Sequence, residues 1–213
     1  MDPRTTAVLD ELEARSATEQ TLLEELRTKG VDKVREAAPR LMLDVGRDTG
    51  MFLNLVARTQ RARRILEIGG SVGYSTIWLA DAVRANGGGV VISLEFEPQK
   101  VQEQRAYIEA AGLVTEVEQI CGDASVVLPD LDGPFDLVLL DHWKAHYIRE
   151  FDLVWPKVRV GGLVMADNIL LPKNVADEIK AYVRHVRGMP DALSLTVPVG
   201  TGVEMTCRTG TAS

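Results

Sequence analysis

Short, almost wholly apolar segments alternate with longer helical ones, and this alternation constrains the fold more than any other feature. The expected strands span residues 64–68, 90–95, 115–121, 135–140 and 163–166, of which 115–121 is the most polar. Strands of this kind are typical of a parallel sheet whose two faces are both covered by helices. The sequence therefore predicts an α/β, Rossmann-like, doubly wound sheet with mostly parallel strands.

The first part of the chain carries a different pattern. Residues 5–27, 31–38 and 47–61 have apolar side chains at helical spacing, and Gly30 and Pro39 end the first two segments. Glycine just past a helix and proline near its end are common stop signals. We therefore expect extra N-terminal helices before the first strand.

The last part of the chain differs again. Residues 192–197 and 203–207 flank a Pro-Val-Gly-Thr-Gly turn. Two such strands joined by a glycine-containing turn indicate an antiparallel hairpin, here at the edge of the sheet. We expect one domain over residues 1–213, with a helical cap over residues 1–45 and a Rossmann-like core over residues 46–213.

Composition narrows the class of partner. The net charge of -7 argues against nucleic acid, because phosphate binding needs a basic surface. No apolar run is long enough to span a membrane, and the polar N-terminus lacks a signal-peptide pattern. Cys121 and Cys207 form no disulfide framework, so a reducing cytoplasmic location is expected.

A glycine-rich turn follows the first strand, between Glu67 and Ser75. Its spacing is not the dinucleotide fingerprint, because Ser71 and Tyr74 stand where glycines would be needed. An acid at Glu67 would repel a pyrophosphate and suits a cationic ligand. Glu95 ends the second strand, where a carboxylate can accept bonds from both ribose hydroxyls. The pair predicts an adenosyl ligand such as S-adenosylmethionine.

The same turn also fits the G-x-S-x-G nucleophile elbow of hydrolases, with Ser71 as nucleophile. Asp141 or Asp167 and His185 would then follow in hydrolase order. This alternative is weaker, because no strand precedes the turn to supply an oxyanion loop and His185 lies in a helical segment.

Hard oxygen ligands end two later strands. Asp141 follows the strand over residues 135–140, and Asp167 and Asn168 follow the next strand. Carboxyl ends of neighbouring parallel strands meet at one edge, and carboxylate and amide oxygens suit Mg²⁺. Lys144 lies three residues after Asp141. A divalent cation and burial would lower the lysine pKa and make Lys144 a base for a hydroxyl.

Together these motifs resemble the catechol O-methyltransferases, a class of S-adenosylmethionine-dependent and Mg²⁺-dependent enzymes. The resemblance rests on the segments Leu140-Asp141-His142-Trp143-Lys144, Ala166-Asp167-Asn168, Glu67 to Ser75, and Glu95. It implies that Asp141, Asp167 and Asn168 hold Mg²⁺ and that Lys144 is the general base. The cofactor contacts that it implies are Val45, Gly46, Glu67, Gly69, Gly73, Tyr74, Ser75, Glu95, Phe96, Asp123, Ala124, Ser125, Asp141, His142 and Trp143.

The resemblance also implies a substrate pocket formed by Leu41, Trp143, Lys144, Asn168, Pro172 and Glu204, with the Glu204 carboxylate accepting a bond from the second catechol hydroxyl. Leu41 replaces a gating aromatic of the family, and Arg47 stands where an acid is usual and would favour an anionic substrate tail. We expect methyl transfer to one hydroxyl of a catechol by a monomer or homodimer. Two alternatives stay open: another vicinal diol or a caffeoyl-type substrate, and a non-catalytic protein that only binds the adenosyl ligand.

Overall fold

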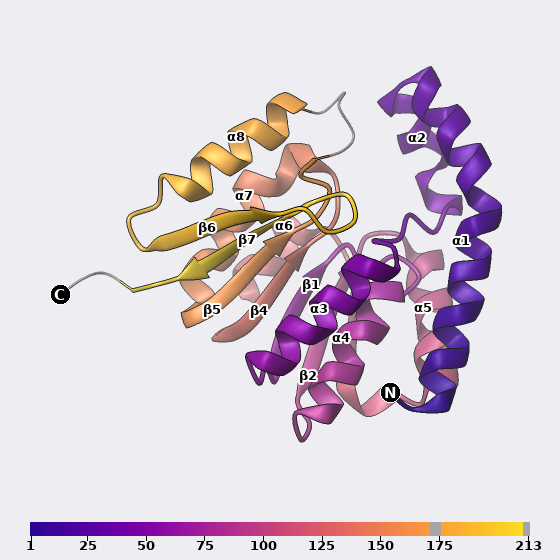
Figure 1. The fold of residues 1–213 in the computed structure, drawn as a ribbon, viewed down its shortest axis with the longest axis horizontal. Helices are drawn as coiled ribbons and strands as arrows, with labels where there is room; N and C mark the ends of the chain where they lie inside the picture. Colours follow the sequence, from indigo (N-terminus) through magenta and orange to yellow (C-terminus); the bar gives the residue numbers. More distant parts are fainter. Residues whose placement is uncertain (171–175, 211–213) are drawn as a thin grey trace.

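The computed structural model describes residues 1–170 and 176–210 and shows a seven-stranded sheet flanked by helices (Figure 1). The strands are β1 (Arg64–Ile68), β2 (Val90–Glu95), β3 (Val117–Cys121), β4 (Phe135–Leu140), β5 (Val158–Ala166), β6 (Ala192–Val197) and β7 (Val203–Arg208). Their order is β3-β2-β1-β4-β5-β7-β6, and β7 is antiparallel to both of its neighbours. The predicted fold class, with its parallel sheet and C-terminal hairpin, is confirmed.

The helices also follow the sequence expectations closely. They are α1 (Pro3–Lys29), α2 (Val31–Ala37), α3 (Arg47–Thr59), α4 (Tyr74–Ala85), α5 (Pro98–Ala111), α6 (Ala124–Val127), α7 (Tyr147–Val154) and α8 (Ala176–Arg187). Single 3₁₀ turns span Ala38–Arg40, Val114–Glu116, Leu128–Asp130, Lys144–His146 and Trp155–Lys157. The turn at Val114–Glu116 delays β3 to Val117, two residues after its expected start. Strand β5 begins five residues earlier than expected, because Gly161 and Gly162 interrupt its apolar pattern without ending it.

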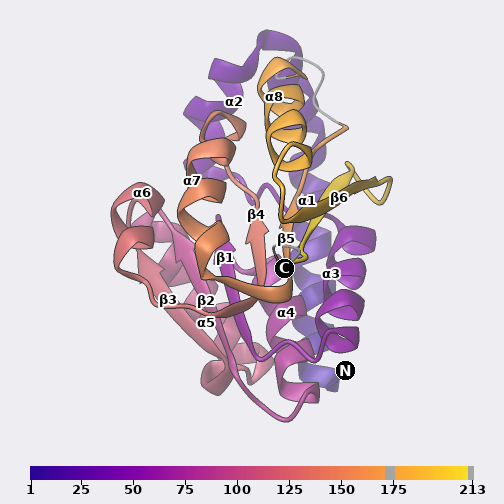
Figure 2. The ribbon, with the colours of Figure 1, turned by 90° about the vertical axis from the view of Figure 1, so that its left-hand side faces the viewer.

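Alternating side chains of the strands build two separate cores. Helices lie on both sides of the sheet (Figure 2). Ile65 of β1 and Leu137 of β4 face one core, where they pack with apolar side chains of α1, α3, α4 and α5. Leu66 and Val138, one residue further along, face the other core with side chains of α7 and α8. Because both faces are covered, the central strands can be apolar at every position.

Helix α1 begins at a well-formed N-cap. The Asp2 carboxylate accepts a hydrogen bond of 2.8 Å from the Arg4 backbone N–H, and Pro3 occupies the first helical position. Only the first half of α1 contributes to the core, through Val8, Leu9 and Leu12. The second half extends beyond the sheet and leads into α2, beside the carboxyl ends of the strands (Figure 1).

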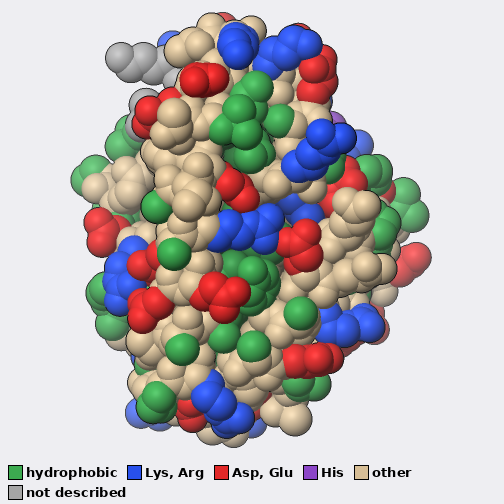
Figure 3. Space-filling view, turned by 90° about the vertical axis from the view of Figure 1, so that its right-hand side faces the viewer, with side chains coloured by type: hydrophobic (Ala, Val, Ile, Leu, Met, Phe, Trp, Pro, Cys, Tyr) green, Lys and Arg blue, Asp and Glu red, His purple; other side chains and the backbone are tan. Residues whose placement is uncertain are grey.

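One face of the molecule carries charged side chains of both signs. Acidic and basic side chains are interspersed across the face that carries α1, and neither sign gathers into a continuous patch there (Figure 3). Within residues 1–170 and 176–210, no helix combines the length and hydropathy needed to cross a bilayer.

Candidate functional site

The sheet register places the predicted acids next to each other. Ile68 of β1 pairs with Leu140 of β4, and Leu140 pairs with Ala166 of β5. The next residues continue this pairing: the Asp141 N–H donates to the Ile68 carbonyl at 2.9 Å, and the Asp167 N–H donates to the Leu140 carbonyl at 3.0 Å. Asp141 and Asp167 therefore follow the carboxyl ends of the adjacent strands β4 and β5. The strand order reverses between β1 and β4, and open α/β sheets bind ligands at the carboxyl ends of the strands beside such a point.

The negative charges of Asp141 and Asp167 repel each other. Burial is the main cause that raises the pKa of Asp141, and the charges of Lys144 and His142 oppose it. Burial and the charge of Asp141 raise the pKa of Asp167 to about 7. Two buried acids that destabilise each other's ionised forms are a favourable place for a cation.

The donor set fits a hard divalent metal such as Mg²⁺. The Asn168 backbone has a φ of 60°, and its Nδ2 donates to Asp167 Oδ2 at 3.1 Å and to Thr201 Oγ1 at 2.8 Å. Two carboxylates and the amide carbonyl of Asn168 are the oxygen ligands that Mg²⁺ accepts. Among the described residues there is no cluster of three or more histidine, cysteine, aspartate or glutamate side chains that could hold a metal ion, so a metal at this site would need the Asn168 amide beside the two acids.

Lys144 lies beside the acids at the start of a 3₁₀ turn, with its side chain only 10% exposed. Its Nζ lies 3.7 Å from Asp141 Oδ1 and donates to the His142 carbonyl at 2.9 Å and to the Tyr147 hydroxyl at 2.6 Å. Burial lowers the pKa of Lys144, and the charges of Asp141 and Asp167 oppose that shift. The ammonium is thus fixed in position and predisposed to lose a proton.

Tyr147 was not predicted from the sequence, although it positions Lys144. It is fully buried, and its hydroxyl contacts the carbonyls of Leu140 at 2.8 Å and Asp167 at 3.1 Å. It therefore connects the ends of β4 and β5 to the lysine. Its position three residues after Lys144, one helical turn away, is the only sequence signal that could have identified it.

His142 and Trp143 occupy the loop between Asp141 and Lys144. His142 Nε2 lies against the buried carboxylate of Glu150, and the centroid of its ring lies 5.1 Å from that of the Tyr147 ring. Trp143 is half-buried, and the guanidinium carbon of Arg35 lies 5.1 Å from the centroid of its ring. This loop is therefore held from α7 on one side and contacted by α2 on the other.

The glycine turn after β1 lies directly against this loop. Gly69 and Gly73 have φ values of 97° and 100°, which side chains rarely adopt. A Cβ added at Gly69 would lie 2.2 Å from the Asp141 carbonyl oxygen, and one at Gly70 would lie 2.1 Å from Ser93 Oγ. The turn then leads into the N-terminus of α4 at Tyr74. A side chain at Gly69 or Gly70 would push the turn away from β4 or β2.

Glu67 is placed differently from the expectation that it contacts the cofactor. Its side chain is fully buried, and its carboxylate accepts hydrogen bonds from Ser75 at 2.6 Å, Thr76 at 2.5 Å and Ser93 at 2.6 Å. Burial raises the pKa of Glu67, and these hydrogen bonds oppose the shift. Glu67 and Ser75 therefore bond to each other beneath the glycine turn and support it from inside.

Glu95 ends β2 at the other side of the turn. Its Oε2 accepts from the Ser71 N–H at 2.8 Å and its Oε1 from the Glu97 N–H at 2.9 Å. Both oxygens retain acceptor capacity toward a ribose. Phe96 beside it is 65% exposed, so its ring is accessible to a flat ligand ring.

The segment Asp123, Ala124 and Ser125 begins α6 beyond β3. Asp123 Oδ1 caps that helix, accepting from the Ser125 N–H at 2.8 Å and the Ser125 hydroxyl at 2.6 Å. This turn lies next to the end of β2, since the Gly122 N–H donates to the Glu95 carbonyl at 3.0 Å.

The segment with Leu41, Val45 and Gly46 is fastened to α1 and to the glycine turn. Glu19 accepts from the Met42 N–H at 2.7 Å, Ser16 donates to Asp44, and Ser71 donates to the Met42 carbonyl. Leu41 and Val45 are buried, while a Cβ at Gly46 would meet open space. This segment therefore borders the turn, as expected for residues that close over a ligand.

Tyr74 and Arg47 both bond to Glu13 of α1. The Tyr74 hydroxyl donates to Glu13 Oε1 at 2.6 Å, and Arg47 Nη1 lies 2.8 Å from Glu13 Oε2. Arg47 is therefore paired within the protein, which argues against its expected role with an anionic substrate tail. The Tyr74 hydroxyl is similarly engaged with α1 and leaves only its ring and backbone for a ligand.

Glu204 is also placed differently from its expected substrate role. Its side chain is fully buried in β7, and its oxygens contact Arg187 Nε at 2.8 Å, Ser194 Oγ at 2.7 Å and the Thr196 hydroxyl. Those hydrogen bonds lower the pKa of Glu204, which burial alone would raise. These contacts come from α8 and from the neighbouring strand β6. Pro172, the other expected wall, lies outside the described residues.

The hydrolase alternative is excluded by the same network. Ser71 Oγ contacts the Met42 carbonyl and Lys100 Nζ, the latter at 3.1 Å. His185 Nε2 is bonded to Asp152 Oδ1 at 2.6 Å between α8 and α7. The serine and the histidine of a triad therefore do not come together.

The close approach at Gly69 gives a first testable expectation. Gly69→Ala should lower stability and weaken cofactor binding at least about tenfold, because both the φ and the contact with the Asp141 backbone oppose a side chain. Gly88→Ala is a matched control, since Gly88 has a φ of 95° but open space around it. Calorimetric binding of the adenosyl ligand should be normal for Gly88→Ala, and equal losses in both variants would contradict the steric argument.

Comparison with known proteins agrees with this geometry. The O-methyltransferase family model matches residues 13–198. Proteins named catechol O-methyltransferase from Niastella koreensis and Mycobacterium tuberculosis are each 37% identical, over 64% and 63% of this chain. The matched region spans 62% and 61% of those two relatives.

Solved structures match over nearly the whole chain. The O-methyltransferase TomG from Streptomyces achromogenes, solved with S-adenosylmethionine, has a TM-score of 0.74 and 28% identity and covers 99% of this chain and 91% of its own. The O-methyltransferase from Bacillus cereus, solved with S-adenosylhomocysteine, has a TM-score of 0.71 and 28% identity over 92% and 99%. With a family model over most of its length and this shared fold, the chain belongs to the O-methyltransferase family.

Proposed function

We propose that this protein transfers the methyl group of S-adenosylmethionine to one hydroxyl of a catechol in a Mg²⁺-dependent reaction. The observation that carries the proposal is the group formed by Asp141, Asp167, Asn168 and Lys144 at one edge of the sheet. A protein that only binds the adenosyl ligand needs neither paired acids nor a buried lysine, so this group favours an enzyme. The names of the relatives from Niastella koreensis and Mycobacterium tuberculosis support a catechol as acceptor.

In this proposal Asp141, Asp167 and Asn168 would hold Mg²⁺, which would supply Lewis-acid activation of a substrate hydroxyl. Lys144 accepts the proton of one substrate hydroxyl through Nζ, while the Tyr147 hydroxyl and the His142 carbonyl keep Nζ in place. The substrate oxygen then forms a bond to the sulfonium methyl carbon as the carbon–sulfur bond breaks. The products are the methyl ether and S-adenosylhomocysteine, and the proton remains on Lys144 until it passes to water.

The adenosyl ligand would lie across the glycine turn. Glu95 would accept bonds from the ribose hydroxyls, Phe96 and residues 123–125 would border the adenine, and Val45 and Gly46 would close over the methionine part. The N-terminus of α4 would favour the ligand carboxylate, because the positive end of a helix attracts anions. Solved relatives that contain S-adenosylmethionine or S-adenosylhomocysteine support this cofactor.

The acceptor has a specific alternative. A relative from Zea mays named caffeoyl-CoA O-methyltransferase 1 is 27% identical over 84% of this chain. Its chemistry would use the same metal and base, because a caffeoyl group also carries two neighbouring hydroxyls. The two acceptors differ in what is attached to the ring, so a product assay with both resolves the choice.

Removal of the metal tests the proposal directly. Exhaustive chelation should lower turnover of a catechol by about a hundredfold or more, and added Mg²⁺ should restore it, because orientation of both oxygens depends on the metal. Labelled cofactor and chromatographic detection of the methylated product measure the effect. Zinc added at the same concentration is the control for non-specific rescue, and full turnover after chelation would refute the metal-dependent mechanism.

A further inference from the structure

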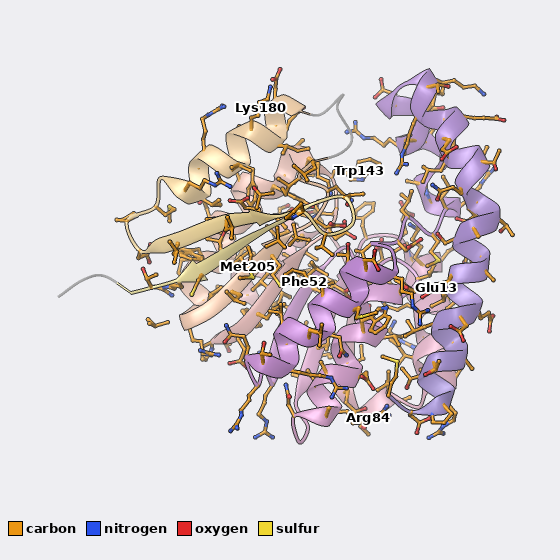
Figure 4. The ribbon with its side chains drawn as sticks, viewed as in Figure 1. Glu13, Phe52, Arg84, Trp143, Lys180 and Met205 are labelled. Carbon is orange, nitrogen blue, oxygen red and sulfur yellow. The ribbon has the colours of Figure 1, made fainter. Side chains whose placement is uncertain are left out.

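Arg35 contacts Trp143, which lies next to the proposed base in the sequence. It lies in α2, 108 residues before Trp143 in the sequence, and its Cζ lies 5.1 Å from the centroid of the Trp143 ring. Trp143 directly precedes Lys144, and it lies at the top of the sheet, between the strand ends and α2 (Figure 4). A cation from the helical segment is thus held next to the proposed base.

This guanidinium has no acidic partner among the described residues. Arg47 is paired with Glu13 and Lys33 with Glu36 at 2.7 Å, whereas no described carboxylate oxygen lies within 4.0 Å of an Arg35 nitrogen. Arg35 is also exposed. An arginine that rests with its face on an indole keeps its N–H edges free, and these edges match a carboxylate in two parallel hydrogen bonds.

Acidic side chains lie near Arg35 in the chain and deeper at the site. Asp32 and Glu36 lie on the same helix, and Asp44, Asp141 and Asp167 lie deeper at the site. These acids and the net charge of -7 repel an anion, so the positive charge of Arg35 favours the approach of one to Trp143. A neutral or cationic catechol needs no arginine there, and a cationic one would be repelled by it.

We propose that Arg35, held against Trp143, binds an anionic tail of the substrate, so that the preferred acceptor is an aromatic vicinal diol bearing a negative charge. The inference rests on the proposed function and adds the charge of the acceptor. Two sources of this charge are compatible with a guanidinium: a carboxylate on a short side chain, or the phosphates of a longer thioester tail.

The test compares charge reversal at two positions of α2. Arg35→Glu and Lys33→Glu change the net charge equally, but only Arg35 contacts Trp143. Each protein is assayed with caffeate, catechol and dopamine, which are anionic, neutral and cationic, and with caffeoyl-CoA. For Arg35→Glu we expect kcat/KM to fall about tenfold with caffeate, to change less than about twofold with catechol, and to rise with dopamine.

A different result is expected if the contact between Arg35 and Trp143 has only a structural role. If Arg35 only positions Trp143, then Arg35→Glu lowers kcat/KM equally for all acceptors, and the inference is wrong. It is also wrong if Lys33→Glu reproduces the same charge-dependent pattern. Arg35→Ala, which introduces no acid, should retain the catechol rate and lose the preference for caffeate, and 0.5 M salt should reduce that preference in the wild type.

The comparison of caffeoyl-CoA with caffeate identifies the preferred anion. A larger loss with caffeoyl-CoA than with caffeate identifies phosphate as the preferred anion, and the reverse identifies carboxylate. If the wild type methylates catechol, caffeate and dopamine alike and Arg35→Glu shifts none of them, only the inference about Arg35 fails. If the wild type methylates no diol while it still binds S-adenosylmethionine, the proposed function fails and the inference falls with it.

Discussion

Lys144→Met should lower kcat for a catechol by about a thousandfold and leave the affinity for S-adenosylmethionine nearly unchanged. A positioned general base contributes about 10²–10⁴ in rate, and methionine keeps most of the side-chain volume but cannot accept a proton. The buried Nζ, 2.6 Å from the Tyr147 hydroxyl and 3.7 Å from Asp141 Oδ1, is the only titratable amine among the described residues that directly contacts both. Turnover with labelled cofactor and calorimetric binding of the cofactor measure the two quantities.

Two further variants separate the loss of the base from other effects. Lys144→Arg keeps a positive charge beside Asp141, but a guanidinium does not give up its proton in proteins, so this variant should be as inactive as Lys144→Met. Lys180→Ala, on the exposed surface of α8 (Figure 4), should keep the wild-type rate. If Lys144→Arg retained most of the activity, the lysine would act through its charge rather than as a base.

The acids could be predicted from the sequence because their meeting depends on local information. Each of Asp141 and Asp167 directly follows an apolar strand, and parallel strands end at a shared edge. The strands themselves were predicted by the same apolar pattern, except where Gly161 and Gly162 interrupted it. The residue that follows each strand can therefore be predicted from the sequence of that strand alone.

The roles of Glu67, Glu204 and Arg35 could not be predicted in this way. The partners of Glu67 lie on α4 and β2, those of Glu204 lie on α8 and β6, and the aromatic partner of Arg35 lies in the loop after β4. Each contact depends on how separate elements pack in three dimensions. A motif identifies an acid next to a glycine turn, but only packing decides whether that acid faces a ligand or the hydroxyls beneath the turn.

Asp167→Asn should abolish Mg²⁺-dependent turnover and, in the chelated protein at pH 8, raise stability by about 1–2 kcal/mol. At that pH the metal-free site buries the ionised carboxylate of Asp167, whose pKa burial and the charge of Asp141 raise to about 7. Removal of one charge relieves the repulsion, at the cost of weaker bonds to Asn168 and Thr201. For a chain of this size the gain corresponds to a melting temperature higher by about 2–8 °C, which calorimetry measures.

The pH dependence gives the sign of this effect independently. Between the unfolded value of 3.8 and about 7, native Asp167 holds a proton that the unfolded chain has released, so the stability of the chelated wild type falls as pH rises through this window. Asp167→Asn should show a smaller fall, because burial also raises the pKa of Asp141 and Glu67, whereas Asp177→Asn, on a fully exposed side chain of α8, should follow the wild type. Mg²⁺ should stabilise the wild type and not Asp167→Asn, because only a protein that binds the metal gains stability from it. A destabilised Asp167→Asn at pH 8 would mean that the carboxylate serves the fold, and the case for a metal site would lose its electrostatic basis.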